Sequence, residues 1–189
     1  MIAIMSETLA NHLRSLPHRQ IAVDANEHVF RVAAPVVSLF LVLEGAVQLE
    51  RHLPTGARLI LQRAQTGDVL AEASCFATHY HCSGVAVRSS RLLSIPMKSF
   101  TAQCQSDSLL ASAFTAHLAT EIQRARARSE ILSLKTVSAR LDAWLELGDG
   151  HLPPKGEWSA LADMLSVTPE ALYRELSRRR KLGEAVDRF

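Results

Sequence analysis

The chain has few cysteines and no long hydrophobic run. Only Cys75, Cys82 and Cys104 occur among 189 residues, and a small odd number argues against a disulfide-stabilised secreted fold. No apolar stretch approaches the ~20 residues that a membrane-spanning helix needs. The first fifteen residues contain no basic segment of the kind that begins a secretory signal. We therefore expect a cytoplasmic protein with no membrane partner.

Excess charge of one sign is also absent. Lysine and arginine number 21 against 19 acidic residues, for a formal net charge of +2, which excludes a uniformly basic nucleic-acid coat. Any attraction to phosphate must come from a local cluster of cations. A hydrophobic content of 48% and a charged content of 21% are ordinary for a folded protein, and the length allows one or two domains.

Residues 19–96 have the pattern of a β domain, after a short amphipathic helix expected over 6–16. Short runs of Val, Ile and Leu are separated by turn residues at Glu44-Gly45, Pro54-Thr55-Gly56 and Gly67-Asp68. Two separate runs, SGVAV and RLLSIP, close the region, and Pro96 ends the second. Strands of this length and spacing predict an all-β sandwich or barrel.

A long helix is expected over about 108–134, where neither glycine nor proline occurs. Apolar residues recur there at helical spacing, from Leu110 through Phe114 and Leu118 to Leu132. A helix of this length usually needs a partner for its apolar face, which favours a homodimer. Packing of the helix back onto the β domain is the alternative.

The C-terminal region has the pattern of a helix-turn-helix. A helix at 136–148 and a linker at 149–156 precede a short helix at about 157–165. Ser166-Val167-Thr168 form the turn, with Thr168 as N-cap and Pro169 at the first helical position of the second helix. This second helix, about 169–179, is expected to turn Leu172 and Leu176 inward.

The second helix would dock in the major groove of double-stranded DNA through its N-terminal residues. Arg174 could contact guanine or a phosphate, and Glu170 could accept from a cytosine amine. The basic run that follows would supply the sequence-independent attraction to phosphate. The candidate DNA-contacting residues are Thr168, Pro169, Glu170, Tyr173, Arg174, Ser177, Arg178, Arg179, Arg180 and Lys181.

Five segments, in the same order, resemble the Crp–Fnr superfamily of transcription regulators. Each is weakly specific alone, and their shared order over about 140 residues carries the resemblance. They are FLVLEGAVQL (40–49), PTGARLILQRAQTGDVLAEASCF (54–76), HCSGVAVRSSRLLSIP (81–96), SLKTVSARLDAWL (133–145), which contains the recurrent Arg140-Leu141, and LADMLSVTPEALYREL (161–176).

The resemblance implies an α+β protein. Its expected parts are an N-terminal β jelly roll (a double-stranded β-helix) as effector domain over 1–105, a dimerisation helix over 106–134 and a helix-turn-helix domain over 135–189. In such proteins a small effector binds inside the jelly roll, and the long helix transmits a shift to the paired recognition helices. The resemblance thus implies a homodimeric, non-enzymatic regulator that binds a pseudo-palindromic operator.

The effector residues depart from those of cAMP-binding relatives. The Gly-Glu pair that holds the ribose corresponds to Ala71-Glu72, and the Arg-Ser pair that clamps the cyclic phosphate corresponds to Cys82-Ser83. Without that arginine, an anionic phosphate loses a bidentate charge-assisted bond, so cAMP is not expected to bind. Arg126 on the long helix could supply a cation instead. The candidate effector-binding residues are Glu72, Cys82, Ser83 and Arg126, and the effector itself is unknown.

Metal and haem cofactors are not supported by the sequence. The cysteine set that carries an iron–sulfur cluster in oxygen-sensing relatives is absent, which excludes that cofactor. Cys75, His79, His81 and Cys82 lie within eight residues, but their spacing fits no standard zinc pattern, and a polar loop with half-buried cysteines is favoured. Whether one of these residues binds a haem or a metal ion is left open, and the sequence gives no support for it.

A cupin-like oxygenase is the enzymatic alternative, since cupins share the jelly-roll shape and use a His-x-His motif. His79 and His81 have this spacing, but no carboxylate follows His81 in CSGVAV. We therefore expect no enzyme.

A degenerate regulator that binds a partner protein instead of DNA is a further alternative. Ser166 stands where the tight turn usually has glycine, and Glu175 stands at an often apolar position. The printed sequence ends at Phe189, so LGEAVDRF supplies at most one strand of the β-hairpin wing that relatives have. A truncated wing is therefore expected.

Overall fold

The computed structural model describes residues 2–56, 58–148 and 150–182, with side chains from residue 9 onward. They form two compact units, residues 1–120 and 121–189, and the boundary falls within one long helix. The elements of the first unit, in chain order, are α1 (Ile2–Ser15), β1 (Arg19–Val23), β2 (His28–Phe30), β3 (Ser38–His52), β4 (Arg58–Gln65), β5 (Val69–Leu70), the 3-10 turn Glu72–Ser74, β6 (Ser83–Pro96), α2 (Met97–Ser106) and the start of α3 (Ser108–Ser133).

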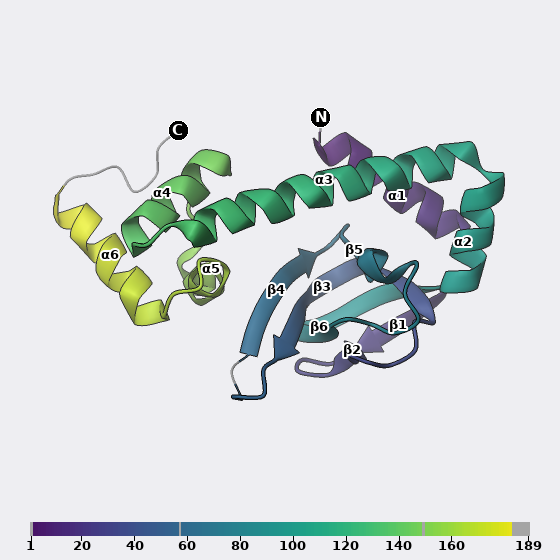
Figure 1. The fold of residues 1–189 in the computed structure, drawn as a ribbon, viewed down its shortest axis with the longest axis horizontal. Coiled ribbons are helices and arrows are strands. Elements are labelled where there is room, and N and C mark those ends of the chain that lie inside the picture. Colours follow the sequence, from purple (N-terminus) through teal and green to yellow (C-terminus); the bar gives the residue numbers. More distant parts are fainter. Residues whose placement is uncertain (1, 57, 149, 183–189) are drawn as a thin grey trace. The chain divides into compact units, whose positions relative to one another are not determined.

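The β domain is an antiparallel sheet of six strands (Figure 1), which confirms the expected jelly-roll fold. Strand order is β1-β6-β3-β4, with β2 paired to β6 and β5 paired to β3. One of its two hydrophobic clusters lies among the strands and contains Phe40, Val42 and Leu92. The other joins the sheet to the helices through Leu13 of α1, Phe100 of α2 and Phe114 of α3. The first part of α3 therefore packs on its own β domain.

Two expected strand breaks are wrong. Glu44-Gly45 is not a turn: β3 runs through it, and its pairing with β6 shifts register at this point. Gly45 has φ +100°, and a Cβ there would lie 2.2 Å from the hydroxyl oxygen of Ser90 on β6, so the glycine permits a bulge between two long strands. The segments SGVAV and RLLSIP are likewise parts of one strand, β6.

The second unit contains the rest of α3, then α4 (Val137–Leu147), a 3-10 turn (Lys155–Glu157), α5 (Trp158–Met164) and α6 (Pro169–Lys181). Its core joins Ile131 of α3 and Leu141 of α4 to the helix-turn-helix residues Leu161, Leu165, Leu172 and Leu176. The inward placement of Leu172 and Leu176 is as the sequence predicts. The expected wing lies at 183–189, outside the described residues.

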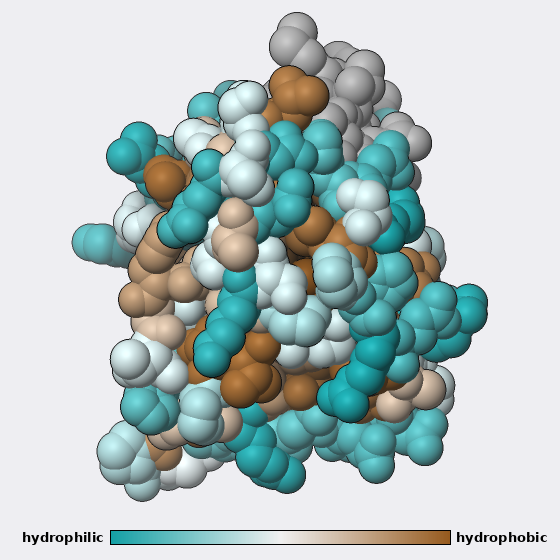
Figure 2. Space-filling view, turned by 90° about the vertical axis from the view of Figure 1, so that its right-hand side faces the viewer, coloured by the Kyte–Doolittle hydropathy of each residue, from teal (hydrophilic) through white to brown (hydrophobic). Residues whose placement is uncertain are grey.

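Polar and charged side chains predominate on the molecular face in Figure 2, with hydrophobic residues gathered between them. Among the described residues, several large hydrophobic side chains are exposed, including Phe76 at 94%, Leu109 at 70% and Ile122 at 53%. None of the described helices combines the length and the apolar composition needed to cross a bilayer.

Candidate effector pocket and DNA-binding helix

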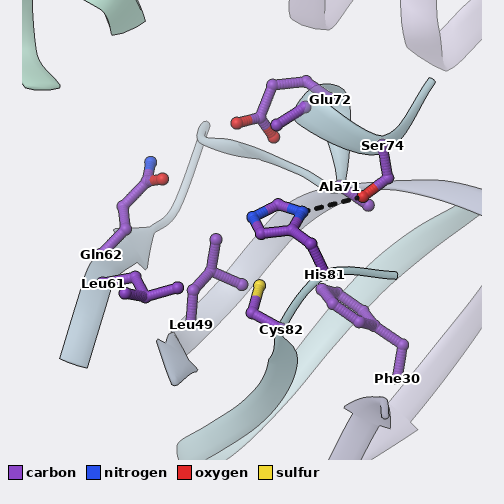
Figure 3. Close-up of a pocket in the computed structure, with 10 residues that line it drawn as sticks. Phe30, Leu49, Leu61, Gln62, Ala71, Glu72, Ser74, His81 and Cys82 are labelled. Carbon is purple, nitrogen blue, oxygen red and sulfur yellow. Dashed lines mark hydrogen bonds between the residues drawn. The ribbon is translucent and has the colours of Figure 1, made fainter. Parts of the chain in front are cut away.

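A small pocket lies inside the jelly roll (Figure 3). Its volume is about 80 Å³, and strand β4, the turn after β5 and the segment before β6 contribute its polar side chains. Its lining residues are Phe30, Leu49, Leu61, Gln62, Ala71, Glu72, Ala73, Ser74, His81 and Cys82. No arginine or lysine is among these described lining residues, and pockets that enclose a drug-sized ligand measure ~300–1,000 Å³.

Burial shifts the pKa values of two polar groups in this pocket toward their neutral forms. His81 lies in the middle of the pocket, where its Nδ1 is 3.3 Å from the hydroxyl of Ser74. Burial, helped by the positive charge of Arg51, lowers the pKa of the His81 imidazole. Burial raises the pKa of the Cys82 thiol to about 11, so the thiol stays protonated near neutral pH. The pocket therefore offers an imidazole and a thiol that favour their neutral forms, together with the buried Glu72 side chain.

Ala71 precedes Glu72 in a left-handed conformation, with φ +69°. Glycine adopts this conformation without cost, whereas a residue with a Cβ is strained there. Ala71 thus holds a backbone conformation that glycine would adopt more easily. Glu72, which follows it, is buried in the pocket lining.

The turn between α5 and α6 is a helix C-terminus of the Schellman type. The Val167 N–H donates to the Ala162 carbonyl at 3.0 Å, and the Ser166 N–H donates to the Asp163 carbonyl at 3.1 Å. Ser166 occupies the left-handed position that glycine usually takes, with φ +50°. Helix α6 then begins as predicted, with the Thr168 hydroxyl accepting from the Ala171 N–H at 3.2 Å and Pro169 in the first turn.

Arg140 of α4 connects this turn to the end of the long helix. Its guanidinium donates to the carbonyls of Leu165 and Ser166 at 2.8 and 3.1 Å. The same group donates to the carbonyls of Leu132 and Leu134 at 3.2 and 2.8 Å. A single cation therefore satisfies carbonyls at the C-terminal ends of two helices, where the helix dipole favours positive charge.

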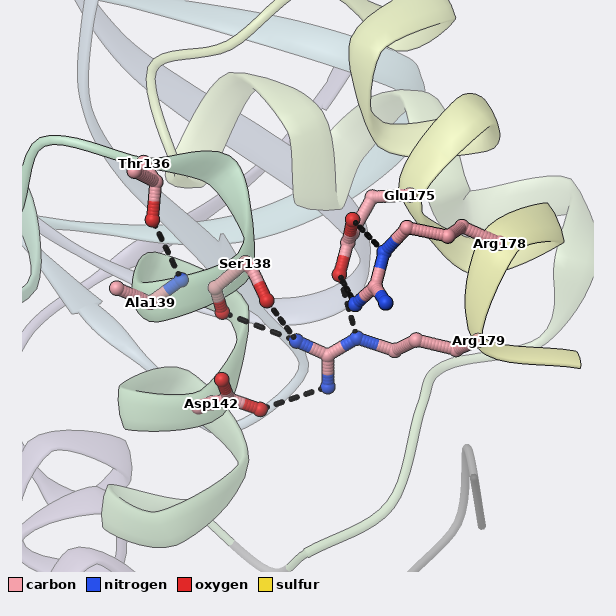
Figure 4. A network of polar contacts seen from close by, with 7 residues as sticks. All are labelled: Thr136, Ser138, Ala139, Asp142, Glu175, Arg178 and Arg179. Atoms are coloured by element: carbon pink, nitrogen blue, oxygen red, sulfur yellow. Dashed lines mark hydrogen bonds and ion pairs between the residues drawn. The ribbon is translucent and has the colours of Figure 1, made fainter. Parts of the chain in front are cut away.

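A buried polar network fixes α6 against α4 (Figure 4). The Arg179 guanidinium donates to Glu175 at 2.8 Å, to Asp142 at 2.7 Å and to both the carbonyl and the hydroxyl of Ser138 at 3.0 Å. The Arg179 side chain is only 6% exposed. Arg178 donates to both carboxylate oxygens of Glu175 at 2.9 and 3.0 Å. Glu175, at an often apolar position, is therefore held between two arginines.

The sequence of residues 20–107 matches the family model of the cyclic nucleotide-binding domain. The jelly roll is therefore similar to that family over these residues. No curated protein matches the chain significantly.

The chain is also similar to solved structures, over more of its length than residues 20–107. FixK2 of Bradyrhizobium japonicum is 22% identical with a TM-score of 0.76, over 89% of this chain and 87% of its own. The c-di-GMP-responsive global regulator CLP of Xanthomonas campestris is 17% identical with a TM-score of 0.66, over 96% and 93%. A CRP-family transcriptional regulator of Thermus thermophilus is 17% identical with a TM-score of 0.65, over 86% and 85%. The chain thus has the fold of the Crp–Fnr regulators.

Of the four candidate effector residues, the jelly-roll pocket brings together two, Glu72 and Cys82. The Ser83 hydroxyl accepts from the Val32 N–H at 3.0 Å and does not line the pocket. Arg126 is exposed on the part of α3 that belongs to the second unit, and it too is absent from the lining. Ser83 and Arg126 were predicted only from the positions of the corresponding residues in relatives. Such a position does not determine what a side chain contacts.

Sequence reasoning missed Gln62, Ser74 and His81 as pocket residues. His81 was considered only as a metal ligand. The sequence signal for His81 as a pocket residue is its position next to Cys82, just before strand β6 begins at Ser83. Cys75 and Cys82, two of the four residues for which the sequence left metal binding open, lie in different hydrophobic clusters of the jelly roll. Over the described ranges, no group of three or more His, Cys, Asp or Glu side chains is placed to hold a metal ion.

Arg179 is a correction to the predicted phosphate contacts. Its guanidinium is buried and hydrogen-bonded within the domain, so it is not available to DNA. Helical spacing contains the signal that was missed, because Arg179 follows Leu172 and Leu176 on the same face. The other nine predicted DNA-contacting residues lie at the surface or partly exposed: Thr168, Pro169, Glu170, Tyr173, Arg174, Ser177, Arg178, Arg180 and Lys181.

Proposed function

We propose that the chain is a DNA-binding transcription regulator of the Crp–Fnr type, which acts in the cytoplasm as a homodimer under the control of a small effector. The exposed face of α6 carries this proposal. Glu170, Tyr173, Arg174 and Ser177 are exposed along its first turns, after the Thr168 N-cap. N-terminal residues of a second helix are those that contact base edges when a helix-turn-helix docks in the major groove.

The cations on α6 have different surroundings, and we assign them different roles on this basis. Arg174 is exposed and belongs to the base-contacting part, where arginine pairs with guanine. Arg180 lies over the Trp158 ring, 5.3 Å from its centroid, and Arg178 is paired with Glu175, so both are held in place near the DNA-facing end. With exposed Lys181 they provide the attraction to phosphate.

Dimerisation through α3 is the second part of the proposal. The helix has 26 residues, and its first part packs on the cyclic nucleotide-binding domain, but Ile122 is 53% exposed. An exposed isoleucine continuing the stripe of Phe114 and Leu118 favours a second copy of α3 as its partner. Two copies related by a twofold axis would present two recognition helices to a pseudo-palindromic site.

The effector is proposed to be a molecule other than a cyclic nucleotide. The pocket supports this because the described residues that line it include Glu72 and neutral polar groups but no arginine or lysine, and because its volume is about 80 Å³. A phosphate placed there would meet the buried Glu72, and none of the lining residues that the structure describes offers it a guanidinium. Arg51 lies outside this lining and donates to the His81 carbonyl. Isothermal titration with cAMP is expected to show no binding, and micromolar binding would contradict this part.

In vitro selection from a pool of random DNA duplexes tests the main proposal. The full chain is expected to enrich an inverted repeat whose half-sites lie about one helical turn apart. The Arg174→Ala variant is expected to enrich nothing, or a site with relaxed half-sites. If the full chain enriches no sequence, the alternative of a dimeric partner-binding protein without sequence-specific DNA binding is favoured instead.

A further inference from the structure

A second and larger cavity lies in the unit formed by residues 121–182. Its volume is about 340 Å³, which reaches the range of ~300–1,000 Å³ typical of small-molecule sites. Helices α3, α4 and α5 all contribute to it. The lining residues are Arg124, Ala127, Arg128, Ile131, Trp144, Leu147, Gly148 and Met164.

The cavity is lined by an apolar wall and by a pair of cations. Ile131, Trp144, Leu147 and Met164 supply the wall. Leu147 is 53% exposed although it lies beside a hydrophobic core, so the wall is only partly covered by the chain itself. The residues from α3 follow one face of the helix, at spacings of three and four, which places Arg124 and Arg128 on successive turns.

The two arginines differ in their access to water. Arg124 is 53% exposed and pairs with Glu121 on its own helix at 2.6 Å. Arg128 is half-buried, and this burial lowers the pKa of its guanidinium. A guanidinium that is partly removed from water gains most from a carboxylate, which it can hold by two parallel hydrogen bonds.

We propose that this cavity binds an amphipathic monocarboxylate, with its apolar part against Trp144 and Met164 and its carboxylate at Arg124 and Arg128. A cavity of about 340 Å³ is in the size range of small-molecule sites and suits a ligand of this kind. The site is separate from the jelly-roll pocket and from the DNA-contacting face of α6. Because three helices line it, a bound ligand connects the end of α3 to the first helix of the helix-turn-helix.

The two tryptophans of the chain allow a direct test, since Trp144 lines the cavity and Trp158 lies in the core, 7% exposed. The probe is octanoate, which has the size and chemistry required, titrated into the full chain labelled with ¹⁵N. The indole N–H signal of Trp144, assigned with Trp144→Phe, is expected to shift and saturate, while that of Trp158 stays in place. Octan-1-ol, which lacks the charge, is expected to bind at least about tenfold more weakly.

Variants on α3 distinguish a specific anion site from a general apolar patch. Arg128→Gln and Arg124→Gln are expected to weaken octanoate binding about tenfold. Arg126→Gln is the matched control, because Arg126 is exposed on the same helix and does not line the cavity. An unchanged Trp158 signal in each variant shows that the unit remains folded.

Four results would overturn the proposal. They are a dissociation constant weaker than about 1 mM, equal binding of octan-1-ol, equal loss in Arg126→Gln and Arg128→Gln, and binding that disappears as the protein dimerises. The last would mean that a second copy of the chain covers the cavity. None of these results bears on operator selection, so a failure here is separable from a failure of the proposed DNA binding.

Discussion

Replacing Arg179 by methionine removes the centre of the network between α4 and α6. The guanidinium makes four hydrogen bonds, to Glu175, Asp142 and both oxygens of Ser138. Loss of one partner from a buried ion pair costs ~3–5 kcal/mol in general. Asp142 is 61% exposed and regains water, and Glu175 keeps Arg178, so we expect the lower end, about 3 kcal/mol.

Urea unfolding followed by tryptophan fluorescence measures this loss, because both tryptophans lie in the second unit. Arg174→Met is the matched control, since Arg174 is exposed on the same helix and should change stability by no more than about 0.5 kcal/mol. The double variant Glu175→Leu/Arg179→Leu is expected to recover much of the loss, because an apolar pair replaces the buried ion pair. If Arg179→Met and Arg174→Met unfold at the same urea concentration, the network does not hold α6 in place.

The same network makes the stability of this unit depend on pH. Hydrogen bonds from Arg178, and then from Arg179 and Ser138, outweigh burial and lower the pKa of Glu175 to about 2. The unfolded chain has the ordinary value of 4.5 and binds the proton first as pH falls. The stabilisation is therefore complete above pH 4.5 and is lost as pH falls toward 2. Glu175→Gln should flatten this part of the pH profile, and an unchanged profile would contradict the assignment.

Three further results are expected. Ser166→Gly should raise the free energy of unfolding by up to about 1 kcal/mol, because glycine accepts the left-handed φ of +50° without strain, and a lowered melting temperature would contradict this. Ile122→Asp should give a monomer in analytical ultracentrifugation while Gln123→Asp remains a dimer, and a dimeric Ile122→Asp would exclude this face as the interface. A disulfide reagent at neutral pH should label at most one of the three cysteines, since Cys75 and Cys82 are buried and burial raises their pKa values to about 12 and 11. Rapid labelling of all three would contradict their placement.

The sequence predicted the elements whose signals are local. The absence of glycine and proline marks α3, and Thr168 with Pro169 marks the start of α6, because capping and helix spacing depend on residues within a few positions. Gly45 was mistaken for a turn because the bulge it permits is decided by Ser90, which lies far along the chain on the partner strand. Whether this glycine forms a turn or a bulge depends on tertiary packing, and no neighbouring residue in the sequence indicates which.

The candidate sites were predictable to different degrees. Glu72 and Cys82 could be placed in the pocket because the order of segments fixes their strand and turn. Arg126 could not, since its position relative to the β domain depends on how two compact units are joined. Arg179 was mistaken for a surface cation because a basic run suggests solvent, although its spacing from Leu172 and Leu176 indicates the buried face.

Sequence-specific binding through α6 is tested most directly by the affinity of the full chain and of Arg174→Ala for the selected duplex over a range of salt concentrations. The logarithm of the affinity of the unaltered chain should fall linearly with the logarithm of the salt concentration. Arg174→Ala should cost ~1–3 kcal/mol and lose its preference at one position of each half-site, whereas Lys181→Ala should lower the salt slope by about one and keep the preference. Equal affinity and equal sequence preference for the unaltered chain and Arg174→Ala would contradict the assignment of α6 as the recognition helix.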